Sequence, residues 1–131
     1  MDFQYNHPCG LLIHRYLTIE QLRNSTLSLV AETMNNEFSW YTLPTVQSKD
    51  HSIVFKLCFL GNSIHSILIY DASPRFGTSW GQHCQSSEQA RAQSTLDWLE
   101  QSSDEQSRII PANLHCGYDE KSGFGACSIR F

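Results

Sequence analysis

The sequence predicts an α+β domain, in which an antiparallel sheet of about five strands carries two helices packed on one face, in the order α-β-β-β-α-β-β. Two observations lead to this class. Three apolar, β-branched segments follow one another over residues 38–71 with no helix between them, and two segments with helical periodicity lie outside that run. The 131 residues contain no repeat or linker, so we expect one domain over residues 1–131.

The first helix is predicted over residues 18–36. Thr18 followed by Gln21 three positions later is a capping-box arrangement, which typically starts a helix. Asn35-Asn36 can end it. Apolar residues between these ends recur at helical spacing: Ile19, Leu22, Leu27, Val30 and Met34.

Three strands are predicted next. Residues 38–46 are aromatic and β-branched, but Pro44 cannot donate a ladder hydrogen bond, so we expect an edge or terminal strand that ends near Leu43. Residues 52–71 read as a hairpin around Gly61-Asn62, since both residues tolerate the positive φ of tight turns. The first arm is apolar on both faces, which favours a homodimer formed through the sheet.

A second helix is predicted over residues 87–101, with Ser86 and Gln89 as its capping box. Two weaker strands follow over residues 108–116 and 124–131. The buried stripe expected for this helix consists of Ala92, Thr95, Leu96 and Leu99, with Trp98 on its flank.

Composition and charge exclude several classes of function. The net charge is -4, from 13 acidic and 9 basic residues, and the basic residues are scattered, so no nucleic-acid partner is expected. The N-terminal segment has no basic leader and no long apolar run, which predicts neither a signal peptide nor a membrane span. A cytoplasmic location follows, and with it the expectation that the five cysteines stay reduced.

The long loop over residues 72–85 is the predicted binding site, because loops of this length are often functional. We expect a small soluble, non-catalytic binding or accessory protein, which takes a small ligand or a protein partner at this loop and needs no cofactor. Aromatic residues flanked by charged ones are typical of recognition pockets. The candidate binding residues are Trp40, Tyr70, Asp71, Arg75, Phe76, Trp80 and His83.

A small cysteine-dependent enzyme is the competing hypothesis. Cys84 lies just ahead of the second predicted helix, whose dipole favours a thiolate, and His115 with Asp71 could complete a catalytic set. Against this, Cys84 stands two residues before the predicted cap. Six other acidic residues are expected to face solvent: Glu20, Glu32, Glu88, Asp97, Glu100 and Asp104.

A zinc-stabilised domain is the third hypothesis. Two His-Cys dipeptides occur, at 83–84 and 115–116, and imidazole and thiolate are the usual zinc ligands. Neighbouring residues on a strand point to opposite faces, so each dipeptide would contribute only one ligand. Cys84, Cys116, Cys127 and His7 could form such a site, but no CxxC or HExxH spacing supports it, and no metal is predicted.

Overall fold

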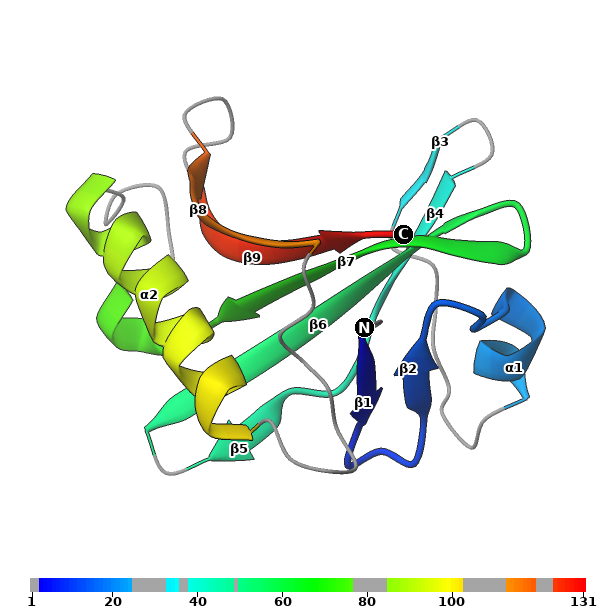
Figure 1. Ribbon diagram of the computed structural model, residues 1–131, viewed down its shortest axis with the longest axis horizontal. Coiled ribbons are helices and arrows are strands. Elements are labelled where there is room, and N and C mark those ends of the chain that lie inside the picture. The colour runs from blue at the N-terminus through cyan, green and yellow to red at the C-terminus, as the bar shows by residue number, and fades with distance from the viewer. Residues whose placement is uncertain are drawn as a thin grey trace.

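The computed structural model describes residues 3–24, 33–35, 38–48, 50–76, 85–102, 113–119 and 124–131. Over these ranges the chain is α+β, as predicted, with antiparallel strands and two α-helices (Figure 1). The elements are β1 (Gln4–Asn6), β2 (Leu12–His14), α1 (Ile19–Arg23), β3 (Thr33–Asn35), β4 (Phe38–Thr42), β5 (Val46–Ser48), β6 (His51–Leu60), β7 (Ser63–Asp71), the 3₁₀ turn η1 (Pro74–Phe76), α2 (Gln85–Ser102), β8 (Leu114–Asp119) and β9 (Phe124–Arg130).

The main sheet is larger than predicted. It has seven strands, six of them in the order β3-β4-β6-β7-β9-β8, and β5 also pairs with β6. β4 was expected at an edge, but it pairs with both β3 and β6. Pro44 does not interrupt this pairing, because β4 has already ended at Thr42. β1 and β2 form a separate two-stranded sheet that the sequence analysis did not predict.

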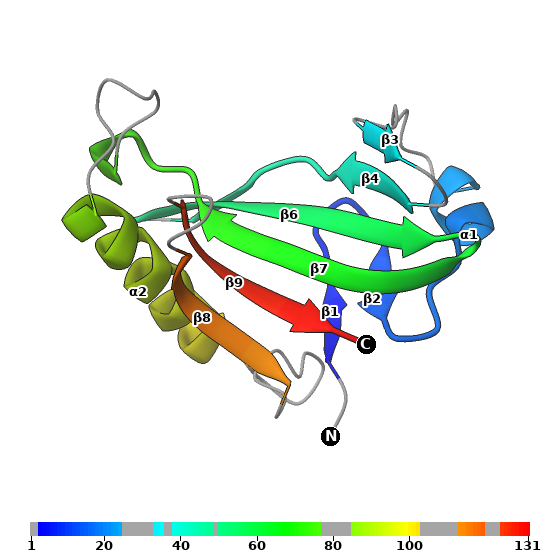
Figure 2. The same ribbon diagram turned by 90° about the horizontal axis from the view of Figure 1, so that it is seen from above.

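The predicted hairpin consists of β6 and β7, which lie next to each other in the middle of the main sheet. β6 pairs with β7 from Ile53 to Leu60, and Gly61 adopts a φ of 62° in the turn, a conformation that glycine accepts without steric cost. The register shifts between Cys58 and Phe59, which is a β-bulge. Seen from above, the two strands run through the middle of the sheet (Figure 2).

The first helix begins as predicted and ends much earlier. The Thr18 hydroxyl accepts a hydrogen bond from the Gln21 backbone N–H at 3.2 Å, and the Gln21 side chain accepts one from the Thr18 N–H at 3.0 Å, which completes the capping box. The helix closes at Arg23, and residues 33–35, predicted as helical, are a strand paired with β4. Sheet pairing outweighs the apolar spacing there. Residues 25–32 lie outside the described part of the chain.

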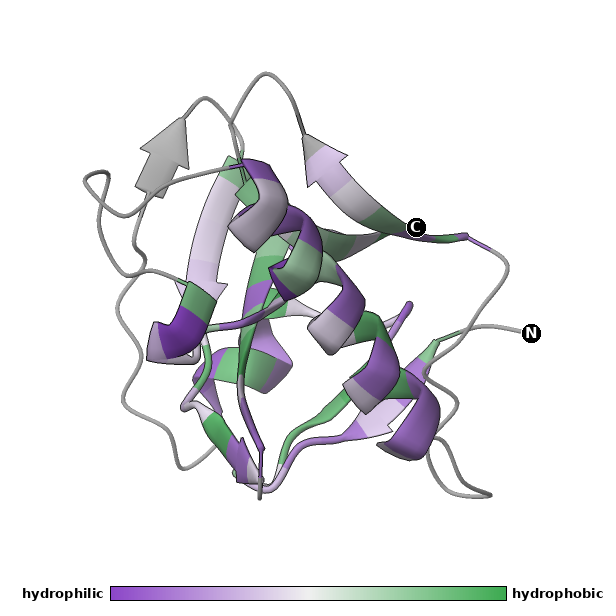
Figure 3. Cartoon of the chain, turned by 90° about the vertical axis from the view of Figure 1, so that its left-hand side faces the viewer, coloured by the Kyte–Doolittle hydropathy of each residue, from purple (hydrophilic) through white to green (hydrophobic). Residues whose placement is uncertain are grey.

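The second helix is confirmed and is slightly longer than predicted. α2 starts at Gln85, so Ser86 lies within the first turn instead of at the cap. Most of the predicted stripe is buried, namely Ala92, Thr95, Trp98 and Leu99. Two charged residues are buried as well: Glu88, which was expected to face solvent, and Arg91, for which no prediction was made. Hydrophilic residues follow the outer side of the helix (Figure 3).

The core lies between one face of the sheet, which we call the inner face, and two elements that pack on it: α2, at the left in Figure 1, and the β1–β2 hairpin, which lies below the sheet. The Tyr5 ring stacks on Phe55 at 5.0 Å, and Trp98 meets Phe55 edge-on at 6.0 Å. Each fully buried side chain of this size contributes about 2 kcal/mol to folding. The N-terminal hairpin therefore completes the core that α2 covers only in part.

The opposite, outer face of the sheet is not covered by any element in the described ranges. Trp40, Lys56, Leu68 and Tyr70 are half-buried on this face, while Val54 and Cys58 on the same face are buried among them. The strand predicted over residues 124–131 is confirmed as β9. The strand predicted over residues 108–116 overlaps β8, which begins at Leu114, and residues 108–112 are not described. Neither described helix is both long and apolar enough to cross a membrane.

Candidate functional site

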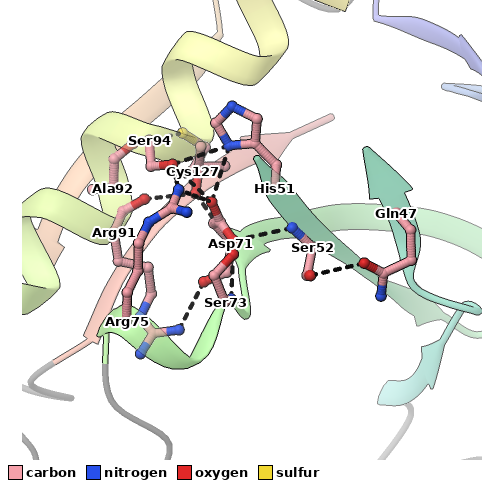
Figure 4. A network of polar contacts seen from close by, with 11 residues as sticks. Gln47, His51, Ser52, Asp71, Ser73, Arg75, Arg91, Ala92, Ser94 and Cys127 are labelled. Atoms are coloured by element: carbon pink, nitrogen blue, oxygen red, sulfur yellow. Dashed lines mark hydrogen bonds and ion pairs between the residues drawn. The ribbon is translucent and has the colours of Figure 1, made fainter. Parts of the chain in front are cut away.

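Asp71, the last residue of β7, is the centre of a buried polar network. Its side chain is fully buried, and a carboxylate in that position must be satisfied by hydrogen bonds. Oδ1 accepts from the Ser52 N–H at 3.2 Å and from both the N–H and the hydroxyl of Ser73. Oδ2 faces His51 Nδ1 at 3.0 Å, the Ser94 hydroxyl at 2.7 Å and Arg75 Nη2 at 3.5 Å (Figure 4).

These contacts keep Asp71 ionised. Burial alone raises the pKa of the carboxyl group, but the hydrogen bonds from Ser73, Ser94 and His51 outweigh it and lower the pKa from 3.8 to about 2. A carboxylate has about four acceptor positions, and the surrounding donors occupy them. Asp71 therefore serves as an anchor for its neighbours, and neither as a proton donor nor as a free metal ligand.

The serine, histidine and aspartate here do not form a catalytic relay. In such a relay the aspartate and the serine bind different nitrogens of the imidazole, so that the ring can pass a proton between them. Ser94 Oγ and Asp71 Oδ2 both lie against Nδ1 of His51, at 3.1 and 3.0 Å. The Ser94 proton points to Asp71, so the hydroxyl is a positioned donor and is not activated as a nucleophile.

Two groups of the network reach the surface. The Arg75 side chain is 50% exposed, and its guanidinium lies 4.7 Å above the centre of the Phe76 ring, a cation–π contact. Its hydrogen bonds to Asp71 and Ser94 both use Nη2, which leaves the Nε and Nη1 donors without a partner in the described part of the chain. Nε2 of His51 is likewise free of described partners, because Nδ1 makes the contacts with Asp71 and Ser94.

A buried ion pair supports the network from behind. Arg91 and Glu88 on α2 are both nearly inaccessible and lie 3.1 Å apart, which contradicts the expectation that Glu88 faces solvent. Arg91 also donates to the carbonyls of Asp71 at 2.7 Å and Phe76 at 3.0 Å. Glu88 accepts from the Gly125 N–H at 3.0 Å. The pair thereby ties α2 to the end of β7, to η1 and to the start of β9.

The structure brings three of the predicted binding residues together: Asp71, Arg75 and Phe76. Tyr70 is adjacent in sequence but lies on the outer face, where it meets Phe124 edge-on at 5.0 Å. Trp40 pairs with Cys58 of β6, whereas Asp71 pairs with Ile53 of the same strand. These two positions are five residues apart, so Trp40 lies about 16 Å along the sheet from Asp71. Trp80, His83 and Cys84 lie outside the described residues.

His115 and Asp71 are not brought together. His115 is exposed on β8 and pairs with Ser128, which belongs to the same face as Leu68. Asp71 shares its face with Ile69 and lies against Thr95 of α2, on the other side of the sheet. The acid and the base of the proposed cysteine enzyme are therefore separated by the sheet.

The expectation that all cysteines are reduced is wrong for two of them. Cys116 and Cys127 face each other directly across β8 and β9 and form a disulfide. Two of the four sulfur and nitrogen ligands considered for zinc are thereby removed as thiolates. His7 is buried, and burial lowers its pKa, with the Pro44 carbonyl opposing this effect. Within the described ranges, no three His, Cys, Asp or Glu side chains gather as a metal site.

His51 and Ser94 were missed by the sequence analysis. They lie 20 residues before and 23 residues after Asp71, and only the pairing of β6 with β7 and the crossing of α2 bring them together. One signal was present in the sequence. Arg91, Ser94 and Thr95 follow the helical spacing of the buried residues Ala92 and Leu99, which indicates a polar patch on the inner side of α2.

Comparison with known proteins assigns no function to this arrangement. No family model matches the chain, and neither a curated protein nor a solved structure is significantly similar to it.

Proposed function

We propose that this protein is a non-catalytic binding protein that takes a small ligand through a carboxylate or phosphate group at Arg75 and His51. The observation that carries the proposal is the buried Asp71 carboxylate, whose contacts hold both side chains in place. Arg75 offers its remaining N–H donors in the fixed fork that suits carboxylate and phosphate oxygens. His51 offers Nε2 beside it as a second polar contact, an acceptor when neutral and a donor when protonated.

Preorganisation is the physical argument for binding. Holding an arginine side chain in one orientation costs about 0.5–1.5 kcal/mol when a ligand has to do it. Here the Phe76 ring and the Asp71 carboxylate already restrict Arg75, so much of this cost falls on folding instead of on association. The Ser94 hydroxyl, which donates to Asp71 and is not activated as a nucleophile, and the low pKa of Asp71 favour recognition over acid–base chemistry.

A ligand panel tests this proposal. We expect small dicarboxylates and phosphate monoesters to raise the melting temperature of the wild-type protein in a thermal shift assay, and their amide or alcohol analogues to leave it unchanged. Arg75→Gln should weaken binding at least tenfold by titration calorimetry. Arg23→Gln, which removes an exposed arginine on α1, is the matched control and should bind as the wild type does.

The proposal fails if no member of the panel raises the melting temperature by more than 1 °C when the ligand concentration is about 100 times a Kd of about 1 µM. It also fails if Arg75→Gln and Arg23→Gln weaken binding equally, because the effect would then be one of net charge.

We further propose a homodimer formed through the outer face of the sheet, in line with the sequence-based expectation. Trp40, Leu68 and Tyr70 supply apolar surface there. We expect light scattering coupled to size exclusion to give twice the 15.0 kDa mass of the chain at 50 µM, and Leu68→Glu to give the single mass. The single mass for the wild type would contradict the dimer, and the double mass for Leu68→Glu would contradict a dimer formed through this face. A cytoplasmic location also stays a proposal, although the reduced state expected to accompany it does not hold for Cys116 and Cys127.

A further inference from the structure

A groove between α2 and β8 lies on the other side of α2 from the Asp71 network. Its volume is about 380 Å³, at the lower end of the range for small-molecule sites. Ala92 and Leu96 line it together with the β8 residues Cys116 and Tyr118. Cys116, which is half-buried, therefore borders a space that a ligand can enter, and its disulfide partner Cys127 is fully buried and does not line the groove.

We propose that the Cys116–Cys127 disulfide is a thiol-exchange site whose substrate is a short cysteine-containing peptide bound in this groove. The difference in exposure sets the direction of attack. A thiolate that enters the groove meets Cys116 first, with Cys127 behind it as the leaving group. Exchange of this kind requires access to one sulfur and a defined leaving group on the other side.

The groove has the chemistry to recognise a peptide. Gln85, Gln89 and Gln93 are spaced four residues apart on α2, which places their amides in a row along the groove. Each amide can both donate to and accept from a peptide group, and none carries a charge. The row therefore matches a short peptide better than it matches a strongly charged ligand.

The free edge of β8 adds backbone groups beside the same sulfur. Cys116 and Cys127 are directly opposed with their Cα atoms 4.0 Å apart, which is typical of a pair that does not exchange backbone hydrogen bonds. The N–H and C=O of Cys116 therefore point away from β9. β8 pairs only with β9 in the described part of the chain, so these groups can pair with an extended peptide.

The exchange balances without another reactant. The peptide thiolate bonds to Cys116 Sγ, the bond between Cys116 and Cys127 breaks, and the electron pair stays on Cys127 Sγ. The proton released by the peptide thiol ends on Cys127, whose sulfur lies 3.9 Å from the Ala92 carbonyl and can donate to it as a thiol. The thiolate of a second peptide then attacks the peptide sulfur of the mixed disulfide, the bond from that sulfur to Cys116 Sγ breaks, and Cys116 leaves with the electron pair and takes up the proton of the second thiol. The products are an oxidised peptide dimer and two reduced cysteines. The protein is the oxidant, once per molecule.

A blocked tripeptide, acetyl-Ala-Cys-Ala-amide, which carries peptide groups and no charge, is the test probe, and 2-mercaptoethanol is an uncharged thiol without peptide groups. The full chain, purified without reductant, is mixed with each, quenched with acid and mapped by mass spectrometry. We expect the mixed disulfide on Cys116 with Cys127 as the free thiol. At equal thiolate concentration we expect the tripeptide to react at least tenfold faster. Gln89→Leu should remove this preference, while Gln4→Leu, an exposed glutamine on β1, should keep it.

Three results would overturn the proposal: free thiols on both cysteines in the purified protein, adducts on Cys127 in place of Cys116, or equal rates for the two probes. Cys58, which is buried and whose thiol pKa burial raises, should carry no adduct and serves as an internal reference. Circular dichroism melting of each variant separates loss of recognition from loss of fold. This site does not depend on ligand binding at Arg75, because Gln89 lines the groove between α2 and β8, whereas Arg75 belongs to the Asp71 network and does not line that groove.

Discussion

We expect Asp71→Ala to lower the free energy of unfolding by about 3–5 kcal/mol, because breaking a buried charged network leaves its other members without partners. The Ser52 and Ser73 N–H groups would each lose a buried acceptor, and His51 and Ser94 would lose the group that orients them. Urea denaturation followed by circular dichroism at pH 7 measures the change. Asp50→Ala, which removes an exposed carboxylate, is the control and should change stability by less than about 0.5 kcal/mol.

The same variant has a distinct dependence on pH. The pKa of Asp71 in the folded protein, about 2, is below its ordinary value of 3.8, so ionised Asp71 stabilises the fold above pH 4. This contribution, about 2 kcal/mol, is lost as the pH falls from 4 to 2. The stability difference between wild type and Asp71→Ala should shrink by that amount over the same window. A difference below 1 kcal/mol at pH 7, or one that does not change with pH, contradicts the anchoring role.

The parts of the fold that the sequence predicted are those that local interactions determine. The Thr18 capping box and the turn at Gly61 each depend on residues within a few positions of one another, and both are present in the structure. The strand over residues 33–35 depends on pairing with β4, so its apolar spacing alone suggested a helix. The Cys116–Cys127 disulfide depends on the register of β8 against β9, which no local pattern in the sequence specifies.

In the candidate site, too, the residues marked by a local sequence signal were predicted, and those placed by long-range packing were not. Asp71 and Arg75 were predicted from their position where a strand meets a long loop. Their partners could not be predicted, because His51 lies at the far end of the β6–β7 hairpin in sequence, and Ser94 lies on a helix whose crossing point is set by packing. The wrong expectation for Glu88 has the same origin, since its burial depends on Arg91 being buried with it.

Gly125→Ala should be the most destabilising change of a single methyl group in the described part of the chain. A Cβ at this position would lie 1.6 Å from the backbone oxygen of Glu88 and 2.5 Å from its carbonyl carbon, so β9 and α2 would have to move apart. That movement would also break the hydrogen bond from Gly125 N–H to the Glu88 carboxylate, which holds the buried Arg91 pair. Overpacking typically costs about 1–3 kcal/mol, and disturbing a buried ion pair adds to it.

We therefore expect Gly125→Ala to lower the free energy of unfolding by about 3 kcal/mol or more, and the melting temperature by about 10 °C. Gly117→Ala is a closely matched control, because Gly117 lies on the neighbouring strand and no atom comes within 4 Å of its added Cβ. It should change stability by no more than about 0.5 kcal/mol. If the two substitutions have equal effects, then α2 does not pack against β9 at Glu88. In that case the Glu88–Arg91 ion pair cannot be what holds η1 and Arg75 in place.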